Sequence, residues 1–427
     1  MSKKLNIWIL QTGEPIHLDN EMPRPMRGMN LANKLVELGH NVNFISSTFY
    51  HQKKIHRPNK NAVNKINSQL KITLIDSPGY KKNISLSRFY DHMIMAYNLK
   101  KFLDHTLETP DAVFIGYPPI EISYVMSRWL KKKGIPFILD IKDQWPDFIL
   151  DAFPYLIKVF GKLILLPYYY MAKETINNAN AVTSMSESFI DWSNKFKNIN
   201  SDYKSLVLPL VPSQDVYLED EIAYAEKWCD DIGIDKGGMI NILFIGSLSK
   251  VFDFNTIINC AKRIEPINKK IKFIVCGKGE LEEPLREKAK HLSNLVLTGW
   301  VDRNKINAIA ARSYLGIAPY RNIKNFRDNI PNKIIDYVSL GLPIISPLQG
   351  EVEKLISDKE IGVIYTEKSD NSLMEVIFDL ISKKNLRDKL SSNAIELYNS
   401  KYSYNYVYGK AVKLIEEVYV LNLNSKN

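Results

Sequence analysis

The stretch INILFIGSLSK, residues 240–250, decides the fold class of this chain. It opens with an apolar run of strand length, and Gly246 ends that run at a turn. A continuous apolar run, as opposed to an alternating one, is typical of a strand buried on both faces of a parallel sheet. The stretch KFIVCGKG, residues 272–279, repeats the plan with a Gly-x-Gly turn. We therefore predict a parallel α/β domain around these two strands.

Strand-like and helix-like patterns alternate on both sides of this stretch. In the second half we expect further strands at 295–298, 315–319 and 343–346, and helices at 255–264, 305–311 and 332–340. In the first half we expect strands at 5–11, 42–46, 70–76, 112–116 and 137–141, and helices at 25–38, 87–105 and 120–133. Such alternation predicts a doubly wound α/β domain in each half, with ligands bound at the carboxyl ends of the strands.

The length of 427 residues also fits two domains. We place the first domain at 1–208 and the second at 239–400. Between them, residues 209–238 hold acidic and polar side chains, two prolines and a Gly-Gly pair, which favour a linker with a little local structure. Residues 401–427 read as a C-terminal helical segment.

The net charge of +10 is concentrated in the first half, in three clusters at residues 53–57, 81–82 and 131–133. Basic clusters suit anionic partners, such as phosphorylated substrates, anionic lipid or nucleic acid. A solvated surface explains each cluster equally well. Nucleic acid is the poorest partner, because no aromatic platform is interleaved with the basic residues, and we expect none.

Three scattered cysteines fit neither a disulfide framework nor a metal site, and they suit a reducing compartment. No apolar stretch reaches 18 residues, so we expect no transmembrane helix.

Two candidate site segments lie in the first half. Gly13 follows the first strand and would let a ligand approach closely, while Arg27 opens the next helix and would point into the same cleft. Lys142 and Asp143 follow the strand at 137–141, where they could touch a reacting centre. The alternatives are a flexible turn and a solvated loop.

The second half carries three more segments. Gly246 is followed four residues later by Lys250, and Gly277 and Gly279 form the second turn. Each turn alone is also what an ordinary strand-to-helix connection looks like. In the segment DNIPNKIID, residues 328–336, the proline suits the first position of a helix, whose N-terminus is a ready anion site. Its two aspartates could hold sugar hydroxyls and its lysine could add positive charge, although a capped surface helix is the plain alternative.

In order and spacing, these segments resemble family 4 of the retaining glycosyltransferases, and within it the bacterial O-antigen and capsule branch. The pieces that carry the resemblance are Gln11–Arg27, Asp140–Asp147, Gly246–Lys250, Gly277–Gly279, Thr298–Val301, Pro319–Tyr320 and Pro331–Pro343. The resemblance implies the GT-B fold: two Rossmann-like domains facing each other across a cleft, with the C-terminal helix crossing back to the N-terminal domain.

The resemblance also implies roles for single residues. Those assigned to the nucleotide-sugar donor are Gly13, Arg27, Gly246, Lys250, Gly277, Gly279, Val301, Asn329, Asn332, Lys333 and Asp336. Among them, Lys250 would contact the donor phosphates, Val301 the nucleotide base and Asp336 the ribose. Asp328 would face the transferred sugar, and we count it with Lys142 and Asp143 as catalytic.

Two departures from the family pattern stand out. Both acids of its Glu-x7-Glu motif are aspartates here, at Asp328 and Asp336. Where many members carry a histidine, the nearest residue is Lys142. We interpret both as variants of a working site.

The implied activity is retaining transfer of a hexose or N-acetylhexosamine, most often from UDP, to a lipid-linked saccharide in surface polysaccharide biosynthesis. The family needs no metal and no cofactor, so we expect neither. The place would be the cytoplasmic face of the cell membrane, and the partners would be the donor, the saccharide acceptor and an anionic membrane surface. Residues 153–171, apolar and aromatic with two lysines, could lie in that membrane interface or pack as a core helix.

Two rival functions stay open. A UDP-sugar 2-epimerase would bind the same donor but would need acid–base carboxylates and histidines in the cleft, and histidines are few here. A non-catalytic subunit that binds a nucleotide sugar is supported by the two aspartates and the missing histidine.

Overall fold

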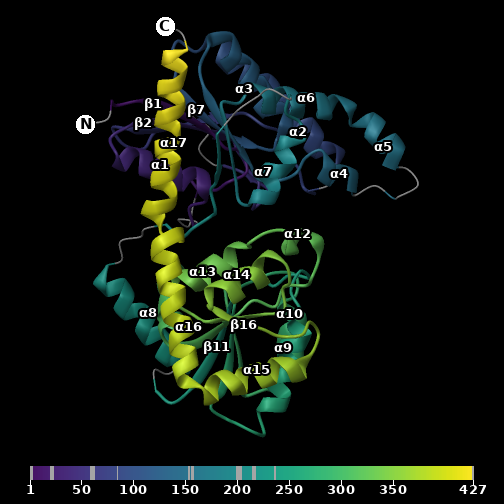
Figure 1. Cartoon of the computed structure of the whole chain (residues 1–427), viewed down its shortest axis with the longest axis vertical. Helices are drawn as coiled ribbons and strands as arrows, with labels where there is room; N and C mark the ends of the chain where they lie inside the picture. Colours follow the sequence, from purple (N-terminus) through teal and green to yellow (C-terminus); the bar gives the residue numbers. More distant parts are fainter. Residues whose placement is uncertain are drawn as a thin grey trace. The chain divides into compact units, whose positions relative to one another are not determined.

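The computed structural model describes residues 3–19, 24–57, 63–83, 85–151, 154, 158–198, 204–213, 218–234 and 237–425, without the side chain of residue 325. Figure 1 shows the course of the chain. It divides into two compact units, unit 1 with Met1–Ser213 and Val407–Asn427, and unit 2 with Gln214–Tyr406.

Unit 1 is built on an eight-stranded sheet of order β10-β9-β8-β7-β1-β2-β6-β5. Its strands are β1 (Asn6–Leu10), β2 (Asn41–Ser47), β5 (Val63–Lys65), β6 (Leu70–Ile75), β7 (Ala112–Tyr117), β8 (Phe137–Ile141), β9 (Ala181–Ser184) and β10 (Lys204–Val207). All neighbours are parallel except β5 and β6. A separate antiparallel pair, β3 (Phe49–Tyr50) and β4 (Ile55–His56), follows β2.

Helices cover this sheet. They are α1 (Arg27–Glu37), α2 (Leu86–His105), α3 (Ile120–Lys133), α4 (Asp147–Asp151), α5 (Lys158–Ile164), α6 (Leu166–Asn178), α7 (Glu187–Asn194) and α17 (Tyr404–Asn424). Helix α3 packs between α2 and α6 over a core in which Trp8 stacks on Trp129 at a centroid distance of 5.8 Å. The long C-terminal helix α17 belongs to this unit from Val407 onward, and Tyr408 accepts a hydrogen bond from Asn30 at 3.2 Å.

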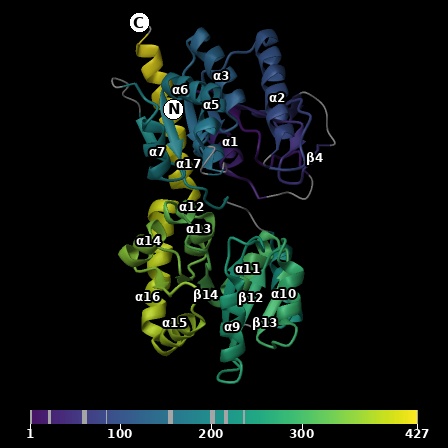
Figure 2. The ribbon, with the colours of Figure 1, turned by 90° about the vertical axis from the view of Figure 1, so that its right-hand side faces the viewer.

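Unit 2 holds a wholly parallel six-stranded sheet of order β13-β12-β11-β14-β15-β16. The strands are β11 (Ile240–Ile245), β12 (Ile271–Cys276), β13 (Leu295–Gly299), β14 (Ser313–Ile317), β15 (Ile344–Ser346) and β16 (Gly362–Ile364). Figure 2 shows α9 (Phe254–Ile264), α10 (Glu282–Ala289) and α11 (Arg303–Ala311) beside β12 and β13. The remaining helices are α8 (Glu219–Asp231), α12 (Lys324–Arg327), α13 (Asn332–Ser339), α14 (Glu351–Lys359), α15 (Asp370–Ser382), α16 (Lys384–Leu397) and the π-helical turn η2 (Tyr398–Tyr402).

The predicted fold class is therefore confirmed: both units are α/β with parallel sheets. The three cysteines are buried and form no disulfide. No helix in the described ranges is both long and apolar enough to cross a membrane.

The predicted linker at 209–238 is more structured than its composition suggested. It contains α8, which lies in unit 2 and buries Ala225 and Cys229. Buried Arg312 holds this helix through ion pairs of 2.6 Å to Glu226 and to Asp230. The polar residues that suggested a linker are the exposed face of an amphipathic helix, and the acidic residues in its first turn suit the helix dipole.

Candidate active site

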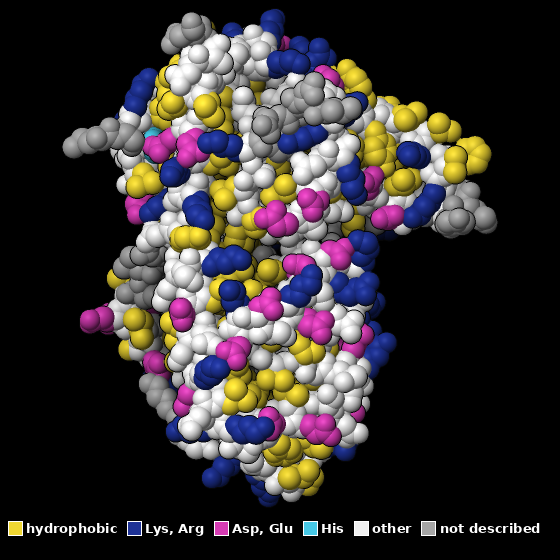
Figure 3. All heavy atoms as spheres, in the orientation of Figure 1, with side chains coloured by type: hydrophobic (Ala, Val, Ile, Leu, Met, Phe, Trp, Pro, Cys, Tyr) yellow, Lys and Arg dark blue, Asp and Glu magenta, His cyan; other side chains and the backbone are white. Residues whose placement is uncertain are grey.

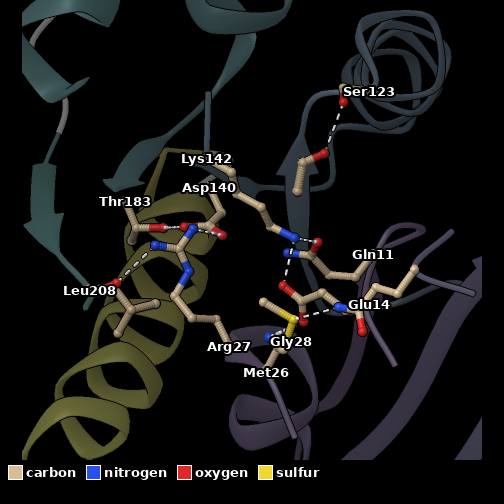
Figure 4. Close-up of polar contacts among 12 residues, drawn as sticks. Gln11, Glu14, Met26, Arg27, Gly28, Ser123, Asp140, Lys142, Thr183 and Leu208 are labelled. Atoms are coloured by element: carbon tan, nitrogen blue, oxygen red, sulfur yellow. Dashed lines mark hydrogen bonds and ion pairs between the residues drawn. The ribbon is translucent and has the colours of Figure 1, made fainter. Parts of the chain in front are cut away.

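In unit 1, the loops that follow β1 and β8 meet at one edge of the sheet. Both strands are parallel neighbours of β7, so their carboxyl ends lie on the same side. Figure 4 shows Gln11 and Glu14 of the first loop pointing toward Lys142 of the second. The structure thus brings together two segments that are more than 120 residues apart in the sequence.

Lys142 ties these loops to helix α1. Its ammonium lies 2.6 Å from one carboxylate oxygen of Glu14 and also donates to the side-chain oxygen of Gln11. The other carboxylate oxygen of Glu14 accepts from the backbone N–H of Gly28 at 2.8 Å. Glu14 is buried, whereas Lys142 keeps about a fifth of its side chain exposed, at 21%. A positive charge is therefore held at the strand edge with part of its surface open.

Arg27 has a different position from the one we predicted. It is 3% exposed, and its guanidinium donates to Asp140 at 2.8 Å and to the carbonyl oxygen of Leu208 at 3.0 Å. Asp140 is fully buried and also accepts from Thr183 at 2.8 Å. Because these partners occupy the guanidinium within the core, we correct its role from ligand contact to positioning. The helix that Arg27 opens is anchored to the sheet.

Asp143 follows Lys142 and is exposed. Desolvation raises the pKa of its carboxyl, and the positive charges of Lys142, Arg88 and Arg27 oppose that shift. A carboxyl group with a raised pKa, surrounded by cations, can hold or release a proton closer to neutral pH than an ordinary aspartate. Gly13 is exposed on the β1 loop, and a Cβ there would meet nothing within 4 Å.

In unit 2, the glycine turns pack backbone against backbone. A Cβ on Gly277 would lie 1.8 Å from the carbonyl oxygen of Gly246, and one on Gly279 would lie 2.4 Å from that of Leu248. Gly246 and Gly277 also have φ values of +146° and +148°. The loops after β11 and β12 can therefore approach this closely only with glycine at these positions.

Lys333 is in the first turn of α13, and its side chain reaches the end of β11. Its ammonium is 4.2 Å from the ring centroid of Phe244 and 5.0 Å from that of Phe252. A Cβ on Gly246 would be 2.1 Å from that ammonium. Lys333 is only 7% exposed, so the glycine turn and two aromatic rings enclose a positive charge at the strand end.

The segment 328–336 contains the start of a helix, as predicted, but the helix begins one residue after the proline. Asp328 is the C-cap of α12 and pairs with Lys324. Pro331 is the N-cap of α13, whose N-terminus has no side-chain cap. The carboxylate of Asp336 contributes, after burial, to the raised pKa of Tyr320. Asn332 is the first residue of α13, and the Asn329 side chain accepts from the backbone N–H of Ile330 at 2.8 Å.

Lys250 and Val301 differ in exposure. The Lys250 side chain is 78% exposed, and its ammonium lies 3.7 Å from the carboxylate of Glu280. Val301 is buried just beyond β13, beside the exposed Trp300. No cluster of three or more histidine, cysteine or acidic residues suited to a metal ion occurs within the described part of the chain.

Glu14, Gln11 and Asp140 were in segments that the sequence singled out, but their roles were missed. Each acts by holding a residue far away in the chain, and such pairing leaves no local pattern. The only available signal was a polar residue directly at or after the end of an apolar strand.

Comparison with known proteins gives a family match over part of the chain. Residues 240–383 match the family described as "Glycosyl transferases group 1". This span begins with β11 and contains both glycine turns, Lys333 and Asp336. It covers less than half of the chain and lies within unit 2.

Relatives and solved structures extend the likeness. The chain is 25% identical over 207 residues to chitobiosyldiphosphodolichol beta-mannosyltransferase of Candida albicans, a match that covers 47% of this chain and 44% of that relative. It thus matches less than half the length of the curated relative. Sucrose-phosphate synthase from Thermosynechococcus elongatus has a TM-score of 0.66 at 11% identity, covering 98% of this chain and 100% of that one. Anabaena HepE in complex with UDP and glucose has a TM-score of 0.61 at 12% identity, covering 97% and 100%. The chain therefore has the GT-B fold of glycosyltransferases over almost its whole length.

Proposed function

We propose that this chain is a retaining glycosyltransferase that moves a sugar from a nucleotide-diphosphate sugar to a lipid-linked saccharide. One observation carries the proposal: the span that matches the glycosyltransferase family, 240–383, is the span that builds the glycine turns, the enclosed lysine and the uncapped helix of unit 2. The likeness to HepE, whose structure holds UDP and glucose, supports UDP as the nucleotide.

In this proposal, unit 2 binds the donor. The N-terminus of α13 attracts the diphosphate, and Lys250 and Lys333 add positive charge where the leaving group gains negative charge. The nucleotide would lie against the backbone of the glycine turns, where Gly246, Gly277 and Gly279 have no side chain to obstruct it. Val301 would contact the base. Because the protein supplies these cations itself, we propose that no divalent ion takes part.

In this proposal, the two aspartates of the segment 328–336 contact different sugars of the donor. Asp336, inside α13, would hold the ribose hydroxyls, and Asp328 would face the transferred sugar after leaving its exposed pairing with Lys324. Asn329 and Asn332 would offer amides to the phosphate and the sugar. We propose that retention arises by front-face attack: the acceptor oxygen attacks on the face from which the diphosphate departs, and a diphosphate oxygen takes the acceptor's proton.

Unit 1 would bind the acceptor. Lys142 and Asp143 lie at the strand ends, one holding a charge in place and the other able to exchange a proton. The name of the Candida relative places the acceptor of that enzyme on a dolichol diphosphate, which supports a lipid-linked acceptor here. We place the reaction in surface polysaccharide synthesis, of the O-antigen or capsule kind.

The test is a donor-release screen. The protein would be incubated with detergent-extracted bacterial lipids and UDP-, GDP- or dTDP-sugars, with and without EDTA, and free nucleotide followed by mass spectrometry. We expect release from one donor that depends on acceptor and not on EDTA, and that falls at least a hundredfold in Asp336→Ala and Lys250→Ala. The anomeric coupling constant of the product, read by NMR, reports retention.

Lys354→Ala is the matched control for Lys250→Ala. Lys354 is 70% exposed on α14 and pairs with Glu351 at 3.2 Å, so its loss removes the same kind of charge elsewhere in unit 2. Donor binding without release under any acceptor would instead indicate a non-catalytic subunit. An isomerised donor formed without acceptor would indicate an epimerase.

We further propose that unit 1 docks on the anionic inner face of the cell membrane. Helix α5 exposes Val159, Phe160, Leu163 and Ile164, each more than half accessible, beside Lys162. The predicted interfacial segment began at Phe153, but residues 152–153 and 155–157 lie outside the described residues. The exposure of α5 favours the interfacial reading over a core helix, whereas α6 buries Ala172, Thr175 and Ile176 against unit 1.

A second exposed apolar stripe lies on α2. Leu86, Tyr90, Met93 and Tyr97 lie at spacings of one helical face on α2, and all are more than half exposed. Phe89 on the same helix contacts Tyr168 of α6 at a centroid distance of 5.7 Å, so the two helices are neighbours. Figure 3 shows apolar side chains interspersed with lysines and arginines over α5, at the right of the view. Apolar groups among basic ones suit an anionic lipid surface.

Vesicle co-sedimentation tests the docking. We expect binding to phosphatidylcholine vesicles that contain phosphatidylglycerol, reduced about tenfold or more when Phe160→Ser is combined with Ile164→Ser, since each loses about 1.5–3 kcal/mol of apolar burial. Ile267→Ser, 63% exposed in unit 2, is the matched control and should bind like wild type. Equal binding by the double variant would contradict the proposed surface.

A further inference from the structure

A group of basic and aromatic residues in unit 1 has no role in the proposed chemistry so far. It consists of His51, Lys54, Tyr80, Arg88 and Trp145, and we call it the basic–aromatic cluster. The first two lie in the turn between β3 and β4, Tyr80 precedes α2, Arg88 lies in the first turn of α2, and Trp145 follows β8. Four separate segments therefore converge at this point.

The two cations of the cluster, Lys54 and Arg88, both contact the ring of Tyr80. The ammonium of Lys54 is 4.4 Å from the ring centroid of Tyr80, and the guanidinium carbon of Arg88 is 5.5 Å from the same centroid. The guanidinium also lies 4.7 Å from the ring centroid of Trp145. Lys54 donates to Nδ1 of His51 at 3.1 Å, and the Tyr80 hydroxyl is hydrogen-bonded to that nitrogen.

The cations of the cluster make no ion pair with a carboxylate among the described residues, and Asp91 and Asp143 act on them only from a longer distance. Burial, followed by the charges of Lys54, Arg88 and His92, lowers the pKa of His51 to about 4. Burial and then Arg88 also lower the pKa of Lys54. Asp91 opposes this shift, but its carboxylate already accepts from Ser77 and from the backbone of Gly79.

One donor of the cluster has no partner in the described part of the chain. The Nε–H of Arg88 is buried and has no acceptor among the described residues, although Nη1 donates to the carbonyl oxygen of Asn83 at 2.9 Å. A buried donor without an acceptor is rare enough to call for an explanation.

The cluster lies next to the candidate active site of unit 1. Trp145 is two residues beyond Asp143, and the charge of Arg88 acts on the Asp143 carboxyl. Trp145 and Tyr80 are themselves buried, so their rings are not open to stack on a sugar. The cluster can therefore recognise a ligand by charge and hydrogen bonding but not by ring stacking.

We propose that the basic–aromatic cluster binds a phosphoryl group of the acceptor substrate. Arg88 and Lys54 would donate to the phosphoryl oxygens, and the anion would relieve the mutual repulsion of the cations. His51 would gain a proton more easily beside the bound anion and become a third donor. That the ligand is an acceptor rests on the proposed function, whereas binding of a phosphoryl group does not.

Titration calorimetry with inorganic pyrophosphate tests the binding. We expect Lys54→Met and Arg88→Gln each to weaken one binding event about tenfold or more, as loss of a charge-assisted hydrogen bond implies. Lys100→Met, an exposed cation of α2 paired with Asp104, is the matched control and should bind like wild type. Affinity that is unchanged in both cluster variants, or that is lost only in Lys250→Ala, would overturn the proposal. Circular dichroism checks that the variants fold.

NMR titration of the histidine side chains provides a second measurement that a folding defect cannot mimic. The pKa of His51 should rise on addition of pyrophosphate, and this rise should be absent in Arg88→Gln. A His51 resonance that titrates identically with and without pyrophosphate would overturn the assignment.

Two sources of the phosphoryl group are distinguished by affinity. Tighter binding of geranyl diphosphate than of glucose 6-phosphate supports the cluster as a site for a lipid diphosphate, and the reverse order supports it as a site for a soluble phosphosugar. Failure of the two proposals is separable. Phosphoryl binding without any sugar transfer would leave the cluster assignment standing and remove the proposed function. If Lys54→Met and Arg88→Gln transfer sugar with an unchanged KM for the acceptor, the proposed function stands. The cluster is then not the acceptor site.

Discussion

The strand ends of the two units are held by different kinds of contact. In unit 1, long side chains from distant segments meet: Arg27 with Asp140, and Lys142 with Glu14. In unit 2, glycine backbones meet, and Gly246 and Gly277 come so close that no side chain fits between them. The first region is held by paired charges and the second by shape.

This difference bears on what each region can recognise. A backbone platform offers the same N–H groups and the same space whichever side chains surround it, so it suits a ligand part shared by many substrates, such as a diphosphate. A side-chain network changes its ligand when one residue changes. The family match falls on unit 2, where close backbone packing restricts the sequence most. We accordingly expect unit 1 to determine the acceptor.

The largest effect should come from breaking the buried pair of unit 1. Asp140→Ala leaves the guanidinium of Arg27 buried without its carboxylate, and we expect a loss of about 3–5 kcal/mol in the free energy of unfolding of unit 1. Urea denaturation followed by a probe in each unit would measure it. Combining Arg27→Met with Asp140→Leu removes both charges and should recover most of the loss. A single variant as stable as wild type would show that the pair does not hold the sheet edge.

Next in size is the backbone contact of unit 2. Gly277→Ala puts a methyl group onto the carbonyl of Gly246 and requires a left-handed φ, so we expect unit 2 to lose about 2–4 kcal/mol through strain and displaced loops. Gly13→Ala is the matched control, since its Cβ meets open space and φ is not positive. Its stability should be within about 0.5 kcal/mol of wild type. Equal melting of both variants in a denaturant titration would contradict the packing argument.

The same contrast explains what the sequence could predict. Strands such as β11 and β12 were predictable because burial on both faces leaves a continuous apolar run. Strand β16 and the β3–β4 pair were not, because two or three residues are too short for a pattern. The extent of helix α8 within the predicted linker could not be predicted, since its buried side consists of few residues, among them Ala225 and Cys229.

The site residues likewise fall into those with a local sequence pattern and those whose partners are distant in the sequence. The glycine turns and the segment 328–336 could be picked out because they are local, with order and spacing fixed within a few residues. Arg27 was assigned to a ligand because its partners, Asp140 and the carbonyl of Leu208, are 113 and 181 residues away. Nothing in the neighbourhood of an arginine in the sequence reveals that a carboxylate elsewhere neutralises it.

A smaller change in the free energy of unfolding should follow when a lysine–glutamate ion pair is removed from either unit. Glu14→Gln removes a buried carboxylate from Lys142 while an amide oxygen can still accept from Gly28, so we expect a cost of about 1–2 kcal/mol in unit 1. Glu280→Gln removes the carboxylate beside exposed Lys250, and we expect a change of at most about 0.5 kcal/mol in unit 2. Chemical denaturation of the two variants measures both. A larger cost for Glu280→Gln would reverse our view of which region depends on charge.

A further effect is a pH dependence of unit 1 that arises from the burial of His51 and His40. The pKa of His51 is lowered from 6.5 to about 4, and burial lowers that of His40 as well. Between these two pH values, the unfolded chain binds protons that the folded unit does not, so acidification favours unfolding. Six of the seven histidines precede residue 106, and unit 2 contains only His291.

Hydrogen exchange measured by mass spectrometry from pH 6.5 to 4, corrected for the intrinsic exchange rate, would read the two units separately. We expect the protection of β1, β2 and α2 to fall more steeply with acidification than that of β11 and β12. His51→Gln should flatten the first slope without moving the second. The raised pKa of Asp143 acts in the opposite direction, because its folded carboxyl binds the extra proton, so the difference between variant and wild type isolates the histidine. Parallel slopes in both units, unaltered by His51→Gln, would contradict a contribution of His51 to the acid sensitivity of unit 1.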